Sequence, residues 1–417
     1  MDTLTHSLAG ALIGETTARW LPDRDGALPK NARRNLFASL MVVGSNLPDI
    51  DFVYSAVTRS KLDYLLQHRG YTHTIVGVLI ESLVMVLVCE AWMRRRRLSA
   101  DLRDRLWILA LALLGPLIHI SMDATNTFGV HPFWPFDNHW LYGDSVFILE
   151  PLFWAAAVPL LFTLQKPWAR AVGVVLLLTA GTWIFSTGMI NTVSGTLLIG
   201  LTITMTLVGY YLTTRKALLV AMSAWAVITA VFIGAHGVAE QQANAVLTER
   251  FPRATLLDSA LSPMPANPLC WEVVSAQVEG DRYALRRAML SISPGLTPVA
   301  QCPNRRLNDP ITAPLRPVAD LSPASRGQSA GSWKWYGELV IPRDELAQLS
   351  GVRCEAAAFM KFARLPWAER MRERWVLGDF RYDREAALGF SEIELAETER
   401  CPALVPPWIP PRRDLLP

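Results

Sequence analysis

Long apolar stretches constrain this chain more than any other feature of its sequence. A helix that crosses a bilayer needs about 20 mostly apolar residues, and six stretches reach or approach that length. They are residues 72–93, 106–122, 146–165, 171–189, 192–212 and 217–236. Two shorter stretches, 4–18 and 36–47, need support from neighbouring helices to cross. We therefore predict an all-α polytopic membrane domain of six to eight helices.

The composition agrees with a membrane location. Hydrophobic residues make up 51% of the 417 residues and charged residues only 18%, which is too apolar for an ordinary soluble protein of two or three domains. The formal net charge of +3 is spread over 40 basic and 37 acidic residues. We therefore expect no nucleic acid as a partner and expect membrane lipids as neighbours.

The basic residues of the short loops predict the orientation. Arginine and lysine gather at 94–97, at 166 and 170, and at 215 and 216, between successive apolar stretches. Loops rich in lysine and arginine stay in the cytoplasm, and the basic segment 19–34 follows the same rule if both short stretches cross. The opposite helix ends then face the extracytoplasmic side of a bacterial inner membrane.

Polar segments alternate with apolar ones beyond residue 239. Segments 271–278, 283–292 and 333–341 alternate as strands do. We predict a membrane domain at 1–140 that carries most of the histidines, further transmembrane helices at 141–238, and an extracytoplasmic soluble α+β domain at 239–417.

Four of the five cysteines lie in this last part. Cys270, Cys302, Cys354 and Cys401 would face an oxidising compartment, so we expect one or two disulfides, with the connectivity open. The N-terminus has no basic region followed by an apolar one, so we expect insertion through internal segments rather than through a cleaved signal peptide.

Histidine is concentrated at the N-terminal end of the chain. Six of the seven histidines lie in the first 139 residues, and most have aspartate nearby. The segments are Asp2-Thr-Leu-Thr-His6, Asn46-Leu-Pro-Asp49-Ile-Asp51, His68-Arg-Gly-Tyr-Thr-His73 and His119-Ile-Ser-Met-Asp123, with His131 a little further on. All of them fall at helix ends that the predicted topology places on the outer side.

Two of these segments have the spacing of metal ligands. Asp2 with His6, and His119 with Asp123, are four residues apart and so share one face of a helix. Imidazole with carboxylate suits zinc or a similar divalent ion, and the number of candidates allows two or three ions. The predicted ligands are Asp2, His6, Asp49, His68, His73, His119, Asp123 and His131.

The single histidines outside this group, His139 and His236, are better explained as ordinary interfacial residues. Asp49, Asp51, Arg69 and Asp123 are the candidate catalytic residues. For Arg69 we weigh two roles, orienting a phosphate or pairing with an acidic ligand. Glu81 and Glu150 are candidates for outer-shell partners of the ligands or for buried, hydrogen-bonded carboxyls.

Four ordered motifs resemble those of one family. The segments 1–10 (MDTLTHSLAG), 45–52 (SNLPDIDF), 68–74 (HRGYTHT) and 119–123 are similar to those of YdjM-type inner-membrane metal-dependent hydrolases. The resemblance implies a membrane-bound hydrolase, distantly related to zinc-dependent phospholipase C and to single-strand nucleases. It implies metal binding by His6, Asp49, His68, His119 and Asp123, with His73 and His131 as additions. The secreted relatives use a processed terminal residue as a ligand, whereas this chain has no cleavage signal, so the third metal stays open.

Our first hypothesis is therefore a metal-dependent hydrolase that acts on small-molecule or lipid phosphoesters at the outer face of the inner membrane, through a metal-activated water. The chain lacks His-Glu-x-x-His, Gly-x-Ser-x-Gly and P-loop motifs. One alternative is a metal-handling or transport protein, although ionisable residues are rare between 146 and 236. Another is a non-catalytic anchor for the C-terminal domain, which leaves the histidines unexplained.

Overall fold

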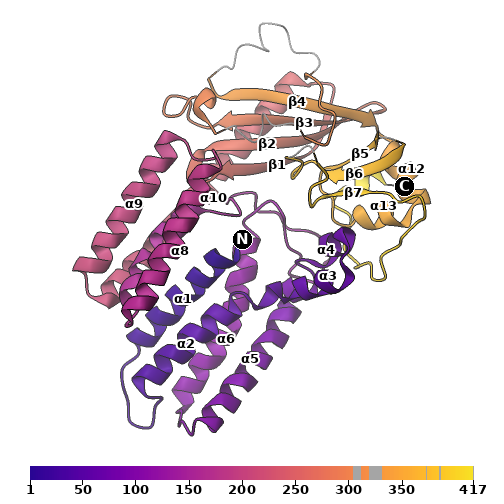
Figure 1. The fold of residues 1–417 in the computed structure, drawn as a ribbon. Coiled ribbons are helices and arrows are strands. Elements are labelled where there is room, and N and C mark those ends of the chain that lie inside the picture. The colour runs from indigo at the N-terminus through magenta and orange to yellow at the C-terminus, as the bar shows by residue number, and fades with distance from the viewer. Residues whose placement is uncertain (304–310, 319–330, 372, 385–386, 417) are drawn as a thin grey trace.

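The computed structural model describes residues 1–303, 311–318, 331–371, 373–384 and 387–416. The helical region comes first in the chain, and a region of antiparallel strands and short helices follows it (Figure 1). This arrangement confirms the predicted fold class.

Four helices form a bundle beneath the N-terminus (Figure 1). They are α1 (Thr3–Trp20), α2 (Lys30–Gly44), α5 (Ile75–Arg95) and α6 (Leu102–Asp123). The segment between α2 and α5 lies at the end of the bundle near the N-terminus and contains short helices: η1 (Leu47–Asp51), α3 (Phe52–Thr58), α4 (Lys61–Gln67) and η2 (Tyr71–His73). The loops α1–α2 and α5–α6, which hold basic residues, lie at the opposite end.

The second helical group consists of α8 (Pro167–Ser186), α9 (Thr192–Tyr211) and α10 (Thr214–Arg250). Five helices of the described chain are long and apolar enough to cross a membrane, namely α5, α6, α8, α9 and α10, and a sixth span results if α2 and the bent η1–α3 segment are counted together. The 37 residues of α10 continue past the predicted stretch 217–236 and contact β1 and β2.

The stretch 146–165 does not form the helix that the sequence analysis expected. It contains the six-residue helix α7 (Pro151–Ala156) and the 3-10 helix η3 (Val158–Thr163). Pro159 lacks the N–H that would donate to the carbonyl oxygen of Ala155 in a continued α-helix, which favours the break after α7. The 13 residues from 151 to 163 would span only about 20 Å even as a continuous helix, which is shorter than the hydrocarbon core of about 30 Å.

The C-terminal region contains two antiparallel sheets among its described residues. The first has the order β1-β2-β3-β4, with β1 (Thr255–Met264), β2 (Asn267–Glu279), β3 (Arg282–Ser291) and β4 (Trp333–Pro342). The second has the order β5-β6-β7, with β5 (Pro366–Met371), β6 (Arg374–Asp379) and β7 (Glu392–Glu394). Helices α12 (Glu345–Val352) and α13 (Cys354–Phe359) precede the second sheet, and the short turns η4 (Val299–Gln301) and η6 (Arg413–Leu415) complete the region.

Disulfides join Cys270 to Cys302 and Cys354 to Cys401. The sequence had left this connectivity open. The first bridge links β2 to the segment after β3, and the second links the start of α13 to the C-terminal segment. Cys89, the remaining cysteine, is buried and unpaired in α5.

One hydrophobic cluster joins the two regions. Leu65 and Leu66 of α4, with Phe128 and Trp140 of the loop after α6, are buried in the same cluster as Phe359 of α13. Polar contacts reinforce this junction: the guanidinium of Arg364 lies 2.8 Å from a carboxylate oxygen of Asp144. The C-terminal region therefore packs directly on the loops at the N-terminal end of the bundle (Figure 1).

Candidate metal centre

Three elements bring most of the predicted ligands together at one end of the bundle. Asp49 and Asp51 lie in η1, His73 ends η2, and His119 and Asp123 lie on the last turns of α6. The i, i+4 spacing places His119 and Asp123 on the same face of α6. The tight packing of α2 on α6, where Gly44 meets Gly115, brings the start of η1 to that face.

Asp49, His73, His119 and Asp123 form the centre of the cluster. Each offers a ligand atom that lies within 4.8 Å of the others. Nε2 of His73 lies 3.0 Å from Nε2 of His119 and 3.5 Å from Oδ1 of Asp49. Nε2 of His73 and Nε2 of His119 each lie 3.4 Å from Oδ2 of Asp123. Three of the four side chains are almost fully buried, and Asp49 is 16% exposed.

A second group shares one member with the first. Asp49, Asp51 and His68 also have ligand atoms within 4.8 Å of one another, and Nδ1 of His68 lies 3.1 Å from Oδ1 of Asp51. Burial lowers the pKa of His68, so its ring is neutral near pH 7 and keeps a lone pair for a ligand. Asp49 lies between the two groups, as a carboxylate that bridges two ions does.

Hydrogen bonds on the far side of the rings fix how the histidines are oriented. Nδ1 of His119 donates to the carbonyl oxygen of Ser45 at 2.8 Å, so the lone pair of this ring is on Nε2, which faces the cluster. Nδ1 of His73 lies 3.3 Å from Oδ2 of Asp51 and faces that carboxylate in the same way. Asp51 therefore orients His73 as well as approaching His68.

The donor set fits a divalent cation. Two imidazole nitrogens and two carboxylates converge with their acceptor atoms toward one point, and such an arrangement is repulsive unless a cation lies between them. Two nitrogens and two oxygens are ligands that zinc accepts in a four-coordinate site.

Arg69 pairs with Asp123 at the edge of the cluster. Its Nε lies 2.9 Å from Oδ2 and its Nη2 lies 3.0 Å from Oδ1 of that carboxylate. Nη1 donates to the side-chain oxygen of Asn126 at 2.9 Å. Burial lowers the pKa of Arg69 to about 10, so the guanidinium stays charged near pH 7.

His6 lies beside the cluster. Its ring stacks on that of His119 with 3.9 Å between centroids, and its Nε2 lies 3.3 Å from Oδ1 of Asp123. The α-amino group of Met1 also contacts this carboxylate. His6 is therefore in reach of an ion that Asp123 holds.

Asp2 and His131 lie apart from both groups. Asp2 is the N-cap of α1, where its carboxylate accepts a hydrogen bond from the backbone N–H of Thr5 at 3.0 Å; this cap occupies the side chain that the i, i+4 spacing assigned to a metal. The ring of His131 packs against Trp140 and Trp408, at centroid distances of 4.4 Å and 3.6 Å. Burial lowers the pKa of His131 to about 3.

Two residues that orient the ligands were not predicted as site residues. Ser45 accepts the hydrogen bond of His119 through its backbone carbonyl, and a backbone group leaves no mark on the residue type. The hydroxyl of Thr72 lies 3.3 Å from Oδ2 of Asp51; its place in the segment 68–74, next to His73, was the signal that could have identified it. A third group with ligand spacing, Cys354, Glu399 and Cys401, is excluded as a metal site because its two sulfurs are joined in a disulfide.

Comparison with known proteins gives the family. The chain is 28% identical over 151 residues to the uncharacterized protein YfhP of Bacillus subtilis (strain 168), a match that covers 36% of this chain and 42% of that protein. No solved structure matches significantly. The family model described as YdjM inner membrane protein matches residues 1–237, which hold the whole cluster. Because this match covers more than half of the 417 residues, the chain belongs to the YdjM inner membrane protein family.

Proposed function

We propose that this multi-pass membrane protein is a metal-dependent hydrolase that cleaves phosphoester bonds of small-molecule or lipid substrates at the outer face of the inner membrane. One observation carries the proposal, namely that the acceptor atoms of Asp49 and of the buried His73, His119 and Asp123 converge toward one point. Buried ionisable groups at a membrane boundary are costly and are kept for function.

The residues suited to hold a first ion, most readily zinc, are Asp49, His73, His119 and Asp123. Asp49, Asp51 and His68 are suited to a second. A divalent ion bound there lowers the pKa of a water molecule and neutralises charge on a phosphoester.

The surrounding residues keep this centre in place. Ser45 and Asp51 hold the imidazoles of His119 and His73 in one orientation. Arg69 balances the charge of Asp123 and, through Nη1, ties it to Asn126. Phe128, which lies under the guanidinium of Arg69 at 4.7 Å, excludes water from that side of the cluster.

Two observations support the extracytoplasmic orientation. The loops α1–α2 and α5–α6, which hold arginines, lie at the end of the bundle opposite the cluster (Figure 1), and such loops stay in the cytoplasm. The C-terminal region, which packs on the cluster's own loops, contains two disulfides, and these persist in an oxidising compartment.

The test is elemental analysis of the purified protein in detergent, combined with hydrolysis of bis(p-nitrophenyl) phosphate. We expect at least one zinc or manganese ion per chain, and loss of both the ion and the hydrolysis in the His119→Ala and Asp123→Ala variants. His139→Ala is the matched control, because His139 is exposed and pairs only with the nearby Asp137 among the described residues.

Each other outcome argues against the proposal in a distinct way. A wild-type protein that binds no ion after reconstitution with zinc and manganese would contradict metal dependence. Bound ions without hydrolysis, but with metal flux in vesicles that His119→Ala abolishes, would favour the metal-handling alternative.

A further inference from the structure

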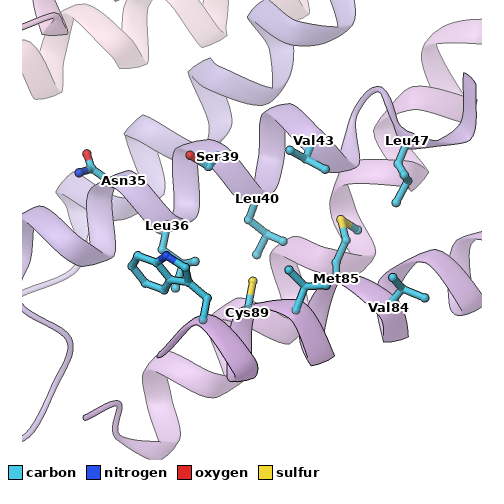
Figure 2. A pocket seen from close by; sticks show the side chains of 11 residues that line it. Asn35, Leu36, Ser39, Leu40, Val43, Leu47, Val84, Met85 and Cys89 are labelled. Carbon is cyan, nitrogen blue, oxygen red and sulfur yellow. The ribbon is translucent and has the colours of Figure 1, made fainter. Parts of the chain in front are cut away.

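An apolar groove runs along the membrane part of the bundle between α2 and α5 (Figure 2). Each of these helices packs extensively on α6, whereas they contact each other much less, and this separation leaves a volume of about 380 Å³. Its lining consists of Asn35, Leu36, Ser39, Leu40, Val43, Leu47, Val84, Met85, Val88, Cys89 and Trp92.

The groove begins next to the metal centre. Leu47, which lines one end, is the first residue of η1, the element that carries Asp49. Asn35 lies at the opposite end, as Figure 2 shows, and Trp92 is close to the basic run at 94–97. Asn35 and Val43 are eight positions apart on α2, which corresponds to about 12 Å, and Leu47 lies beyond the end of that helix. One leaflet of the hydrocarbon core is about 15 Å thick, so the groove follows most of the depth that one extended acyl chain occupies.

Glu81 lies between the groove and the metal centre. It precedes Met85 and Cys89 of the groove lining by four and eight residues on α5, and so shares their helix face. The side chain is 8% exposed, and neither carboxylate oxygen has a hydrogen-bond partner among the described residues. A buried, charged carboxylate without a partner is costly, so Glu81 is most stable as the neutral carboxylic acid. Its O–H is then suited to donate a hydrogen bond to a ligand.

We propose that the groove holds one acyl chain of a lipid phosphoester substrate, with its phosphoester at the metal centre and an ester carbonyl that accepts a hydrogen bond from the carboxyl group of Glu81. This inference rests on the proposed hydrolase and restricts its substrates to lipids. An acyl chain is the occupant that the position favours, because the exposed valines of the lining, Val84 and Val88, open the groove to the bilayer.

The first test compares two substitutions on α5. Val88 lines the groove and is 61% exposed, whereas Leu87 is 60% exposed and does not line it. Val88→Trp should fill the groove and lower kcat/KM for dipalmitoyl phosphatidylglycerol in mixed micelles by roughly tenfold or more, with kcat/KM for bis(p-nitrophenyl) phosphate unchanged. Leu87→Trp should change neither value. Equal effects of the two variants, or full lipid activity in Val88→Trp, would overturn the proposal.

The second test concerns Glu81. Glu81→Leu keeps the size of the side chain and removes its hydrogen-bond donor, so KM for the lipid should rise several-fold with little change in kcat, whereas Glu81→Gln keeps an N–H donor and should resemble the wild type. Glu90→Leu, on the same helix and at a residue that pairs with Arg105 at the surface, is the control. An unchanged KM for the lipid in Glu81→Leu would exclude the contact.

A binding measurement separates this inference from the hydrolase itself. A phosphatidylglycerol with a diazirine at the end of one acyl chain should label peptides of α2 and α5, and Val88→Trp should reduce the labelling. If the wild-type protein hydrolyses neither substrate but is labelled there, the groove site stands and the proposed reaction fails. Labelling that Val88→Trp leaves unchanged, or that falls elsewhere, overturns the groove site.

Discussion

Two buried residues of this protein show how a polar side chain is kept inside a mostly apolar structure. Arg69 forms an ion pair with Asp123 through Nε and Nη2 and donates a hydrogen bond from Nη1 to Asn126. Glu150, at the start of α7, accepts hydrogen bonds from the backbone N–H groups of Leu152 and Ala266. In both cases at least one partner belongs to a distant segment, so a substitution affects more than one element.

Arg69→Lys should destabilise the protein although the charge is kept. A lysine ammonium cannot reproduce the planar, two-pronged contact with Asp123 and at the same time reach Asn126. We expect the free energy of unfolding to fall by about 1–3 kcal/mol, measured by denaturant titration in detergent. Arg19→Lys is the control: Arg19 makes one partly exposed i, i+4 pair with Glu15, and its change should stay below about 0.5 kcal/mol. Equal losses in the two variants would contradict the role assigned to Arg69.

Glu150 should make stability depend on pH. Burial raises the pKa of Glu150 from 4.5 to about 8 in the folded protein, so between these values the unfolded state releases a proton that the folded state keeps. The contribution of this group to stability is therefore largest at acidic pH and is lost as the pH rises toward about 8.

Glu150→Gln removes this pH dependence, because the amide oxygen still accepts hydrogen bonds and does not ionise. Its melting temperature should match the wild type near pH 5 and exceed it near pH 9. Glu249→Gln, at an exposed position of α10, should follow the wild type at both. A wild-type melting temperature that does not fall between the two pH values would exclude the effect.

At the scale of elements, close packing between helices sets where the ligands stand. Gly10 and Gly14 of α1 meet the backbone of α2, Gly10 also meets the side chain of Ser45, and Gly115 of α6 meets Gly44 of α2. His119 follows Gly115 by one helical turn, so the distance between α2 and α6 fixes its distance from Asp49.

Gly115→Ala should therefore disturb the metal centre without touching a ligand. The added Cβ would lie 2.9 Å from Cα of Gly44, and this overpacking should lower the free energy of unfolding by about 1–3 kcal/mol. We expect weaker zinc binding as α6 shifts, measured by zinc titration. Gly200→Ala in α9 is the matched control, since its Cβ meets no described atom within 4 Å. Unchanged zinc affinity in Gly115→Ala would show that the centre adapts to the shift.

At the scale of the whole molecule, the C-terminal region takes part in the core around the centre. Trp408 is fully buried, packs against the ring of His131 and donates a hydrogen bond from Nε1 to the carbonyl oxygen of Leu66 at 3.1 Å. Trp140, in the loop after α6, donates to the carbonyl oxygen of Lys361. The two regions therefore stabilise each other through side chains that lie far apart in the sequence.

Trp408→Ala should loosen this junction. The cavity should cost about 3–5 kcal/mol of stability, and limited proteolysis should cleave the C-terminal region faster than in the wild type. Trp168→Ala serves as the control, because Trp168 is 66% exposed and its loss should leave the proteolysis rate unchanged. Equal proteolysis of the two variants would show that the regions are independent.

The sequence determined the fold class of this protein through the length and polarity of successive segments. Apolar stretches long enough to cross a bilayer predicted the membrane helices, and alternation beyond residue 239 predicted the strands. Both are confirmed, except at 146–165, which contains only the short helices α7 and η3. The four motifs also identified the family, as the match over residues 1–237 confirms. These signals are local, so they can be read without knowing how the chain packs.

Only the tertiary structure decided which polar residues meet. Asp2 and His6 share a helix face by spacing, yet Asp2 caps its own helix while His6 turns toward Asp123. Asp49 and His119 are 70 positions apart and come within 3.4 Å because α2 packs on α6. Spacing determines the face of an element, whereas the meeting of distant elements depends on close packing between them, which no local pattern encodes.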